Sequence, residues 1–187
     1  MIILDPRIDP RLAADLDAAE ADKLTAYLDT AVPPNWTIGR GHKLPQPMRG
    51  QSWSGFTISQ AVSDRYFQED ILKTFPFCEK LPEWGNMDTP CRKNALRELI
   101  FNMGGRWDGF VDTRKAMQAD PPNWQGAHDG LLNSRWAAEV QPHEFGVNSI
   151  CKHCTAVEGH TAPNDYCKGR DGRATRLARY FLTGQYS

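Results

Sequence analysis

The segment NWTIGRGHKL (residues 35–44) interrupts a chain whose apolar residues otherwise recur with helical spacing. It follows a Pro-Pro-Asn turn signal and mixes β-forming residues with Gly39 and Gly41. Glycine supplies the backbone conformations that tight turns require, so this composition predicts a hairpin in a small β region. A chain with one small β element among several helices is α+β and mainly α.

Apolar periodicity predicts the first helix. Proline is absent from residues 11–32, so the helix is expected to begin near Arg11; the sequence does not define where it ends before Pro33 and Pro34. Tyr27 falls on the same side as the periodic residues. These residues, spaced by four, are Leu12, Leu16, Glu20, Leu24 and Leu28.

Further helices are expected downstream. Thr57 or Ser59 is suited to cap a helix that runs through 61–75, and a second pattern extends from Arg92 to about Met103. Shorter helical pieces are expected at 110–118, 124–136 and 172–182.

Charge and hydropathy exclude several classes of protein. The chain of 187 residues has 22 basic and 23 acidic side chains, and its formal net charge of −1 argues against binding driven by a nucleic-acid backbone. No apolar stretch approaches the roughly 20 residues that span a bilayer. The N-terminal segment does not resemble a signal peptide, so we expect a protein made and folded in the cytoplasm.

Glu20 is out of place among the leucines of the first helix. One interpretation is a helix-end acid whose oxygens are satisfied by arginine or by backbone groups. The other is an acid in a cleft of low dielectric, where burial raises the pKa so that the carboxyl can donate a proton. Position alone does not choose between them.

The neighbours of Glu20 form a pattern. Asp29 follows it by nine residues, and TIGRGH (37–42) begins eight residues later. This arrangement resembles the phage-type lysozymes, glycoside hydrolase family 24, in which a Glu, an Asp on a turn and a Thr-x-Gly-x-Gly-His strand occur in this order. Downstream segments also follow the family's order, and the resemblance covers nearly the whole chain except about 141–169.

The resemblance implies a fold. It implies a single lysozyme domain over residues 1–187, with a small β-containing lobe and linking helix at about 30–75. A larger helical lobe would occupy about 76–187 and carry a Cys/His-rich insertion at about 141–169.

The resemblance also implies a reaction, hydrolysis of the β-1,4 bond between N-acetylmuramic acid and N-acetylglucosamine in peptidoglycan. Such cleavage needs one protonated carboxyl for the leaving oxygen and one ionised carboxylate across the bond. Glu20 is the expected general acid, Asp29 is the expected carboxylate, and Thr37 would help to hold the attacking water. No cofactor is expected for catalysis, and the family implies inversion at the anomeric carbon.

Supporting roles are expected for four residues. Gly41 would let the backbone approach the sugar closely. His42 and Asp70 are expected to pair, which would tie the hairpin to the following helix. Arg173 matches a family arginine that pairs with the catalytic Glu; the alternative is a plain surface or core-capping arginine.

Three further residues align with positions that line the substrate cleft in this family. Phe101, Asn102 and Met103 could contact sugar or peptide, although Phe101 and Met103 could equally belong to the core. Trp124 and Trp136 are expected to be core aromatics.

The expected partner is the glycan strand of peptidoglycan. The protein would be a monomeric endolysin that leaves the host cytoplasm through a holin lesion and acts in the periplasm or cell wall. A rival enzyme is a lytic transglycosylase, which leaves 1,6-anhydro ends, and Asp29 together with Thr37 argues against it. A non-enzymatic rival is a wall-binding module with a lysozyme fold, which has no need of Glu20, Asp29 and Thr37 together.

Five cysteines cannot all pair within one chain. Cys151, Cys154, His160 and Cys167 approach the spacing of a zinc knuckle and could form a closed four-coordinate structural site. The alternatives are a disulfide formed after release, such as Cys154–Cys167, or reduced thiols. Cys78 and Cys91 flank a proline-containing loop and are expected to be a structural pair or free buried thiols.

The zinc interpretation makes a direct prediction. Elemental analysis of the protein purified without added metal should give close to one zinc per chain, because a four-ligand site of this type retains its metal. A metal-free protein that is fully stable would contradict it.

Overall fold

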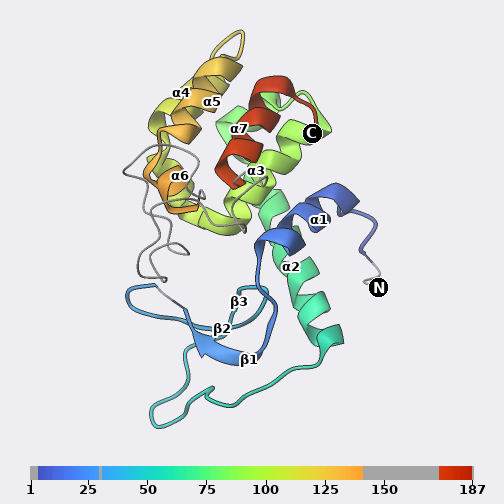
Figure 1. The fold of residues 1–187 in the computed structure, drawn as a ribbon, viewed down its shortest axis with the longest axis vertical. Helices are drawn as coiled ribbons and strands as arrows, with labels where there is room; N and C mark the ends of the chain where they lie inside the picture. Colours follow the sequence, from blue (N-terminus) through green and yellow to red (C-terminus); the bar gives the residue numbers. More distant parts are fainter. Residues whose placement is uncertain (1–3, 30, 141–172, 187) are drawn as a thin grey trace, which may run out of the picture. The chain divides into compact units, whose positions relative to one another are not determined.

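The computed structural model describes residues 4–29, 31–140 and 173–186. The chain divides into two compact units, Met1–Cys78 and Glu79–Ser187. The described residues form seven α-helices, two short 3₁₀ helices and a three-stranded antiparallel sheet near the N-terminus, so the expected α+β, mainly α class is confirmed (Figure 1).

The first helix, α1, spans Pro10–Ala19 and is shorter than the periodicity predicts. Asp9 caps it by accepting a hydrogen bond from the Arg11 backbone N–H, and Pro10 occupies the first turn, where a missing N–H costs nothing. The helix buries Leu12 and Leu16.

The prediction that the helical stripe continues through Leu24 and Leu28 is wrong. Both leucines lie on strand β1, Lys23–Leu28. Glu20 ends α1 in an extended conformation, with φ −110° and ψ 135°. Side chains four residues apart share one face of a strand as well as one face of a helix. The spacing alone therefore does not distinguish a helix from a strand.

The expected hairpin is present and gains β1 as a third strand. β2 spans Trp36–Gly39 and β3 spans His42–Lys43, and the strand order is β1-β2-β3. Glycines with φ of 60° and 89°, Gly39 and Gly41, allow the chain to turn between the last two strands. Ala26, Ile38 and Leu44 form a small core beneath the sheet.

Helix α2, Gln60–Cys78, completes the first unit and contacts β2 and β3. The Val62 N–H lies 3.4 Å from the Ser59 hydroxyl, so Ser59 rather than Thr57 begins the helix. The buried residues of α2 recur every three or four positions and include Phe67 and Ile71.

The second unit is helical in its described residues. Its elements are η1 (Pro82–Asn86), α3 (Pro90–Met103), η2 (Gly104–Gly109), α4 (Val111–Gln118), α5 (Trp124–Leu132), α6 (Arg135–Val140) and α7 (Arg173–Thr183). The helix expected at 124–136 is therefore interrupted at Asn133 and Ser134. The Ser134 hydroxyl donates to the Leu131 carbonyl and accepts from the Ala137 N–H, bonds that end one helix and begin the next.

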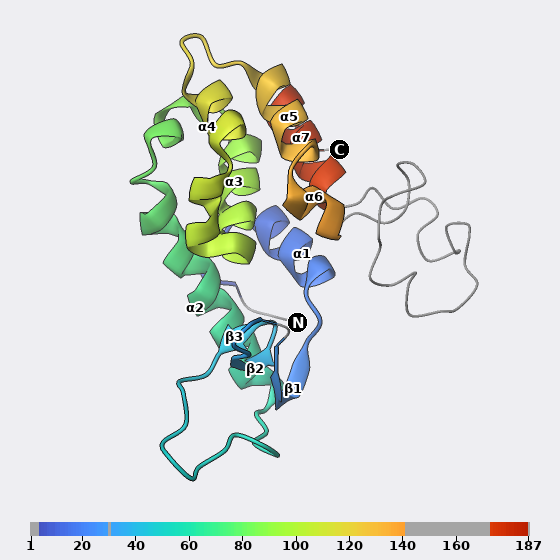
Figure 2. The ribbon, with the colours of Figure 1, turned by 90° about the vertical axis from the view of Figure 1, so that its left-hand side faces the viewer.

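Helix α5 packs against α4 and α7, and α3 packs against α7 and η2 (Figure 2). The buried carboxylate of Glu83 joins η1 to η2 and α4. Glu83 accepts hydrogen bonds from Trp107, Arg114 and Gln118 at 2.6–3.0 Å. Its full burial is tolerable because each oxygen has a partner and one partner is cationic.

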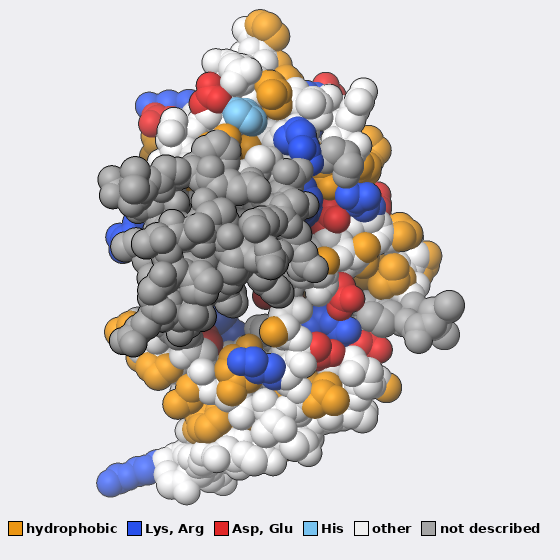
Figure 3. All heavy atoms as spheres, in the orientation of Figure 1, with side chains coloured by type: hydrophobic (Ala, Val, Ile, Leu, Met, Phe, Trp, Pro, Cys, Tyr) orange, Lys and Arg blue, Asp and Glu red, His pale blue; other side chains and the backbone are white. Residues whose placement is uncertain are grey.

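The surface carries mixed charge. On the face drawn in Figure 3, outside the grey residues, basic and acidic side chains are interspersed and form no patch of one sign. None of the helices in the described ranges is long and apolar enough to cross a membrane.

Close packing of α4 on α5 makes a testable prediction. A Cβ added to Gly130 would lie 2.8 Å from the Thr113 hydroxyl oxygen and 3.2 Å from its backbone nitrogen. Gly130→Ala should therefore lower the free energy of unfolding by about 1–3 kcal/mol through overpacking. Thermal unfolding should show a fall of roughly 2–4 °C in Tm for each kcal/mol.

Gly85→Ala is the matched control, because an added Cβ there meets no atom within 4 Å. Equal stability of the two variants would contradict the close contact between α4 and α5.

Candidate active site

Glu20 lies at the junction between α1 and β1. Its backbone N–H donates to the Leu16 carbonyl at 3.0 Å, which ends the helix. The residue is half-buried. Glu20, the expected general acid, thus lies where α1 ends and the chain becomes extended.

Asp29 directly follows β1 and accepts three hydrogen bonds. Its Oδ1 accepts from the backbone N–H of Asn35 at 2.7 Å and of Ala31 at 3.1 Å, and its Oδ2 accepts from the Asn35 side-chain amide at 3.0 Å. Aspartate commonly binds backbone N–H groups of a turn in this way.

These bonds lower the pKa of Asp29 below its ordinary value. The largest cause is the Asn35 backbone N–H; partial burial opposes it, and the Asn35 amide, the Ala31 N–H and the charge of Lys43 reinforce it. A carboxylate that accepts several N–H bonds is favoured in its charged form. Asp29 is therefore suited to remain ionised.

Thr37 lies on the central strand and is 3% exposed. Its hydroxyl is 3.3 Å from the Asn35 carbonyl, to which it can donate. Tyr27 on β1 and Lys43 on β3 are its partners across the sheet. Directly paired residues share a face, so a phenol, a hydroxyl and an ammonium form one row.

Tyr27 connects the expected catalytic residues. Burial raises the pKa of its phenol, and the negative charges of Glu20 and Asp29 raise it further. Thr37 is the partner of Tyr27 on the next strand. Tyr27 is thus paired with Thr37 and is affected by the charges of both expected catalytic carboxylates.

Tyr27 and Lys43 were not assigned a functional role from the sequence. The sequence signal that could have found Tyr27 is the alternation of a strand, because Tyr27 and Asp29 are two residues apart. The helical interpretation of residues 24–28 concealed it.

The expected pair of His42 and Asp70 is confirmed. Their Nδ1 and Oδ2 atoms are 2.8 Å apart, and the His42 ring stacks on Tyr66 with centroids 4.1 Å apart. Asp70 also accepts from Lys73 at 2.7 Å. These contacts join β3 to α2, while Gly41 is exposed in the turn before β3.

The remaining expected site residues lie on the second unit. Asn102 near the end of α3 accepts a hydrogen bond from the indole of Trp136 at 2.9 Å, and Met103 is buried. Phe101 is half-buried. Arg173 on α7 donates to buried Glu98 on α3 at 2.9 Å.

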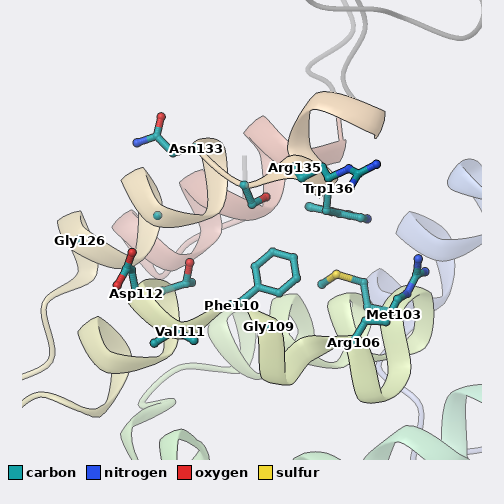
Figure 4. A pocket seen from close by; sticks show the side chains of 13 residues that line it. Met103, Arg106, Gly109, Phe110, Val111, Asp112, Gly126, Asn133, Arg135 and Trp136 are labelled. Atoms are coloured by element: carbon teal, nitrogen blue, oxygen red, sulfur yellow. The ribbon is translucent and has the colours of Figure 1, made fainter.

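A pocket of about 810 Å³ opens on this unit between η2, α4, α5 and α6 (Figure 4). Met103, Phe110 and Trp136 supply apolar surface, and the Phe110 ring points into the space. Asp112 lies on one side and Arg135 on the other. The pocket can therefore hold a molecule that has an apolar face and carries both a positively and a negatively charged group.

Metal ligands are not assembled among the described residues, since no group of three or more His, Cys, Asp or Glu side chains there could hold an ion. The expected zinc ligands Cys151, Cys154, His160 and Cys167 lie outside the described residues. Cys78 and Cys91 are both buried.

The bonds to Asp29 make a prediction that needs no assay of activity. Asn35→Ala removes the side-chain donor and keeps the backbone donor, so the pKa of Asp29 should rise toward the ordinary value. The carboxyl ¹³C resonance followed against pH measures it. Because the folded-state pKa is lowered, Asp29 stabilises the fold at neutral pH, and this contribution is lost as the pH falls through that pKa.

Asp129 is the internal control for the titration. Its pKa is lowered by bonds from His128 and Gln125 on the second unit, so it should titrate identically in both proteins. An Asp29 resonance that titrates as in the parent would show that the Asn35 amide does not act on it.

Comparison with known proteins identifies no family for this chain. No family model and no curated protein sequence matches it. Any assignment of function therefore depends on the residues themselves and on the local geometry of each unit.

Proposed function

We propose that this protein is a lysozyme-like glycoside hydrolase that cleaves the β-1,4 bond between N-acetylmuramic acid and N-acetylglucosamine in peptidoglycan. The observation that carries the proposal is the geometry around β1: Glu20 ends the helix that precedes this strand, Asp29 directly follows it and accepts three N–H bonds, and Thr37 is paired with Tyr27 on it. Two carboxyl groups, one to donate a proton and one to remain ionised, are what acid-assisted glycoside hydrolysis requires.

Glu20 donates a proton to the leaving oxygen as the glycosidic bond breaks. Asp29 remains ionised on account of its three N–H bonds, and it activates water or stabilises the positive charge that develops on the sugar ring. Thr37 is fixed by its place on the central strand and helps to hold the water. Inversion at the anomeric carbon follows from the resemblance to phage-type lysozymes.

The biological setting belongs to the same proposal. The protein acts as a monomeric endolysin of lysozyme-like fold, released from the host cytoplasm through a holin lesion to reach the wall. The lytic transglycosylase is the alternative enzyme. A wall-binding module of the same fold is the alternative without catalysis.

The decisive variant is Glu20→Gln, which keeps the shape of the side chain and removes its proton. Lysis of chloroform-treated Gram-negative cells should fall about 10²–10⁴-fold, the range that general acid catalysis contributes. Glu69→Gln is the matched control, because Glu69 is an exposed glutamate on α2 that is paired only weakly with Arg65 at 3.6 Å. It should lyse cells like the parent.

Two outcomes would contradict the proposal. If Glu20→Gln lysed cells as fast as Glu69→Gln, Glu20 would not be the general acid; if the parent bound the wall and lysed no cells, the protein would be a wall-binding module. If mass spectrometry of digested peptidoglycan showed 1,6-anhydro ends in place of reducing ends, the enzyme would be a transglycosylase.

A further inference from the structure

Arg40 occupies an unusual place for a buried arginine. It lies in the turn between β2 and β3, in the middle of the three residues that separate the paired Ile38 and His42. Residues in such turns ordinarily face solvent, yet Arg40 is only 8% exposed. Some interaction must therefore compensate for removing its guanidinium from water.

Three carboxylates surround this guanidinium. Arg40 is 2.6 Å from Asp17 on α1, 2.9 Å from Asp64 on α2 and 3.3 Å from Asp22 just before β1. The guanidinium also lies over the Phe67 ring, 5.0 Å from its centroid. Arg40 and its three aspartate partners, Asp17, Asp22 and Asp64, are called the Arg40 cluster below.

Polar side chains on α2 complete the Arg40 cluster. Gln60 donates to Asp22 at 2.7 Å and to Asp64 at 3.0 Å, and the Ser63 hydroxyl donates to Asp22 at 2.6 Å. A Cβ on Gly39 would come within 2.8 Å of the Ser63 oxygen. Glycine at position 39 therefore lets the turn approach α2 closely enough for Arg40 to reach its partners.

The position of Glu20 gives the Arg40 cluster a consequence for catalysis. Glu20 lies between Asp17 and Asp22 along the chain, and Arg40 binds both aspartates. The short connection that carries Glu20 is thus fixed at both ends by one side chain. We propose that Arg40 is a positioning residue for Glu20, which fixes the α1–β1 connection and with it the place of the catalytic carboxyl.

This inference rests on the proposed function and differs from a plain stabilising role in one respect. An anchor that only stabilises the fold would change the fraction of folded protein and leave the folded enzyme as active as the parent. A positioning residue changes the turnover of the folded enzyme, since reacting groups must be held in a narrow range of geometry. Lysine cannot replace it fully, because an ammonium lacks the planar set of five donors that spans three carboxylates.

The test compares Arg40→Lys with Asp17→Asn. Asp17→Asn is the milder change, because Asp17 is 48% exposed and only the tie to α1 is weakened. Steady-state kinetics on solubilised peptidoglycan should show kcat reduced about tenfold or more for Arg40→Lys and several-fold for Asp17→Asn, with KM unchanged. The ¹³C carboxyl resonance of Glu20 should shift in both variants.

Arg92→Lys is the matched control on the second unit. Arg92 is also 8% exposed and is paired with Asp88 at 2.6 Å. It should lose stability and keep the kcat of the parent and its Glu20 resonance. This comparison separates the effect of a lost buried arginine from the effect of a misplaced Glu20.

The outcomes distinguish the two proposals. If the parent cleaves peptidoglycan and Glu20→Gln does not, while Arg40→Lys and Asp17→Asn keep the parental kcat, the positioning role is wrong and the proposed function stands. If the parent does not cleave peptidoglycan, the proposed function fails. In that case an unshifted Glu20 resonance in both variants would also overturn the positioning role, and a shifted resonance would support it.

Discussion

In each of the two units, a buried charged side chain is paired with partners from several helices and strands, and it holds these elements together. In the first unit it is the guanidinium of Arg40, and its carboxylate partners come from α1, the α1–β1 connection and α2. In the second unit Glu98 on α3 accepts from Arg173 and Arg176 on α7, and Glu83 joins η1 to η2 and α4. Removing one partner of such a group leaves an uncompensated charge in the interior, so the elements that supply partners are fixed relative to one another.

Local signals were sufficient to predict most helices from the sequence. Apolar residues three or four apart predict α1 and α3, whose first turns each carry a proline after a capping Asp or Thr. The glycines predict the turn between β2 and β3. The extent of α1 was not predictable, because Leu24 and Leu28 satisfy the spacing of a helix and of a strand equally. The pairing of β1 with β2 makes this segment a strand, and that pairing depends on residues distant in sequence.

The candidate site was predictable to a similar degree. Asp29, Thr37 and His42 could be named because the motif keeps them at fixed spacings, and Asp70 was expected on the following helix as the partner of His42. Tyr27 could not, since its pairing with Thr37 arises only when residues 23–28 form a strand. Buried Arg40 was also missed, because an arginine between two glycines in a turn is expected to be exposed.

An irregularity in the sheet determines which groups meet at the site. Lys23 is paired with Gly39, but the register shifts before Tyr27, which is paired with Thr37. In a regular ladder continued from Lys23, Thr37 would instead face Thr25, which in fact bridges to Thr57. The shifted register also brings Asp29 opposite Asn35, whose carbonyl accepts from the Asp29 N–H at 2.9 Å. The bonds that keep Asp29 ionised and the tyrosine beside Thr37 therefore have one structural cause, additional residues in β1 that no local pattern of the sequence reveals.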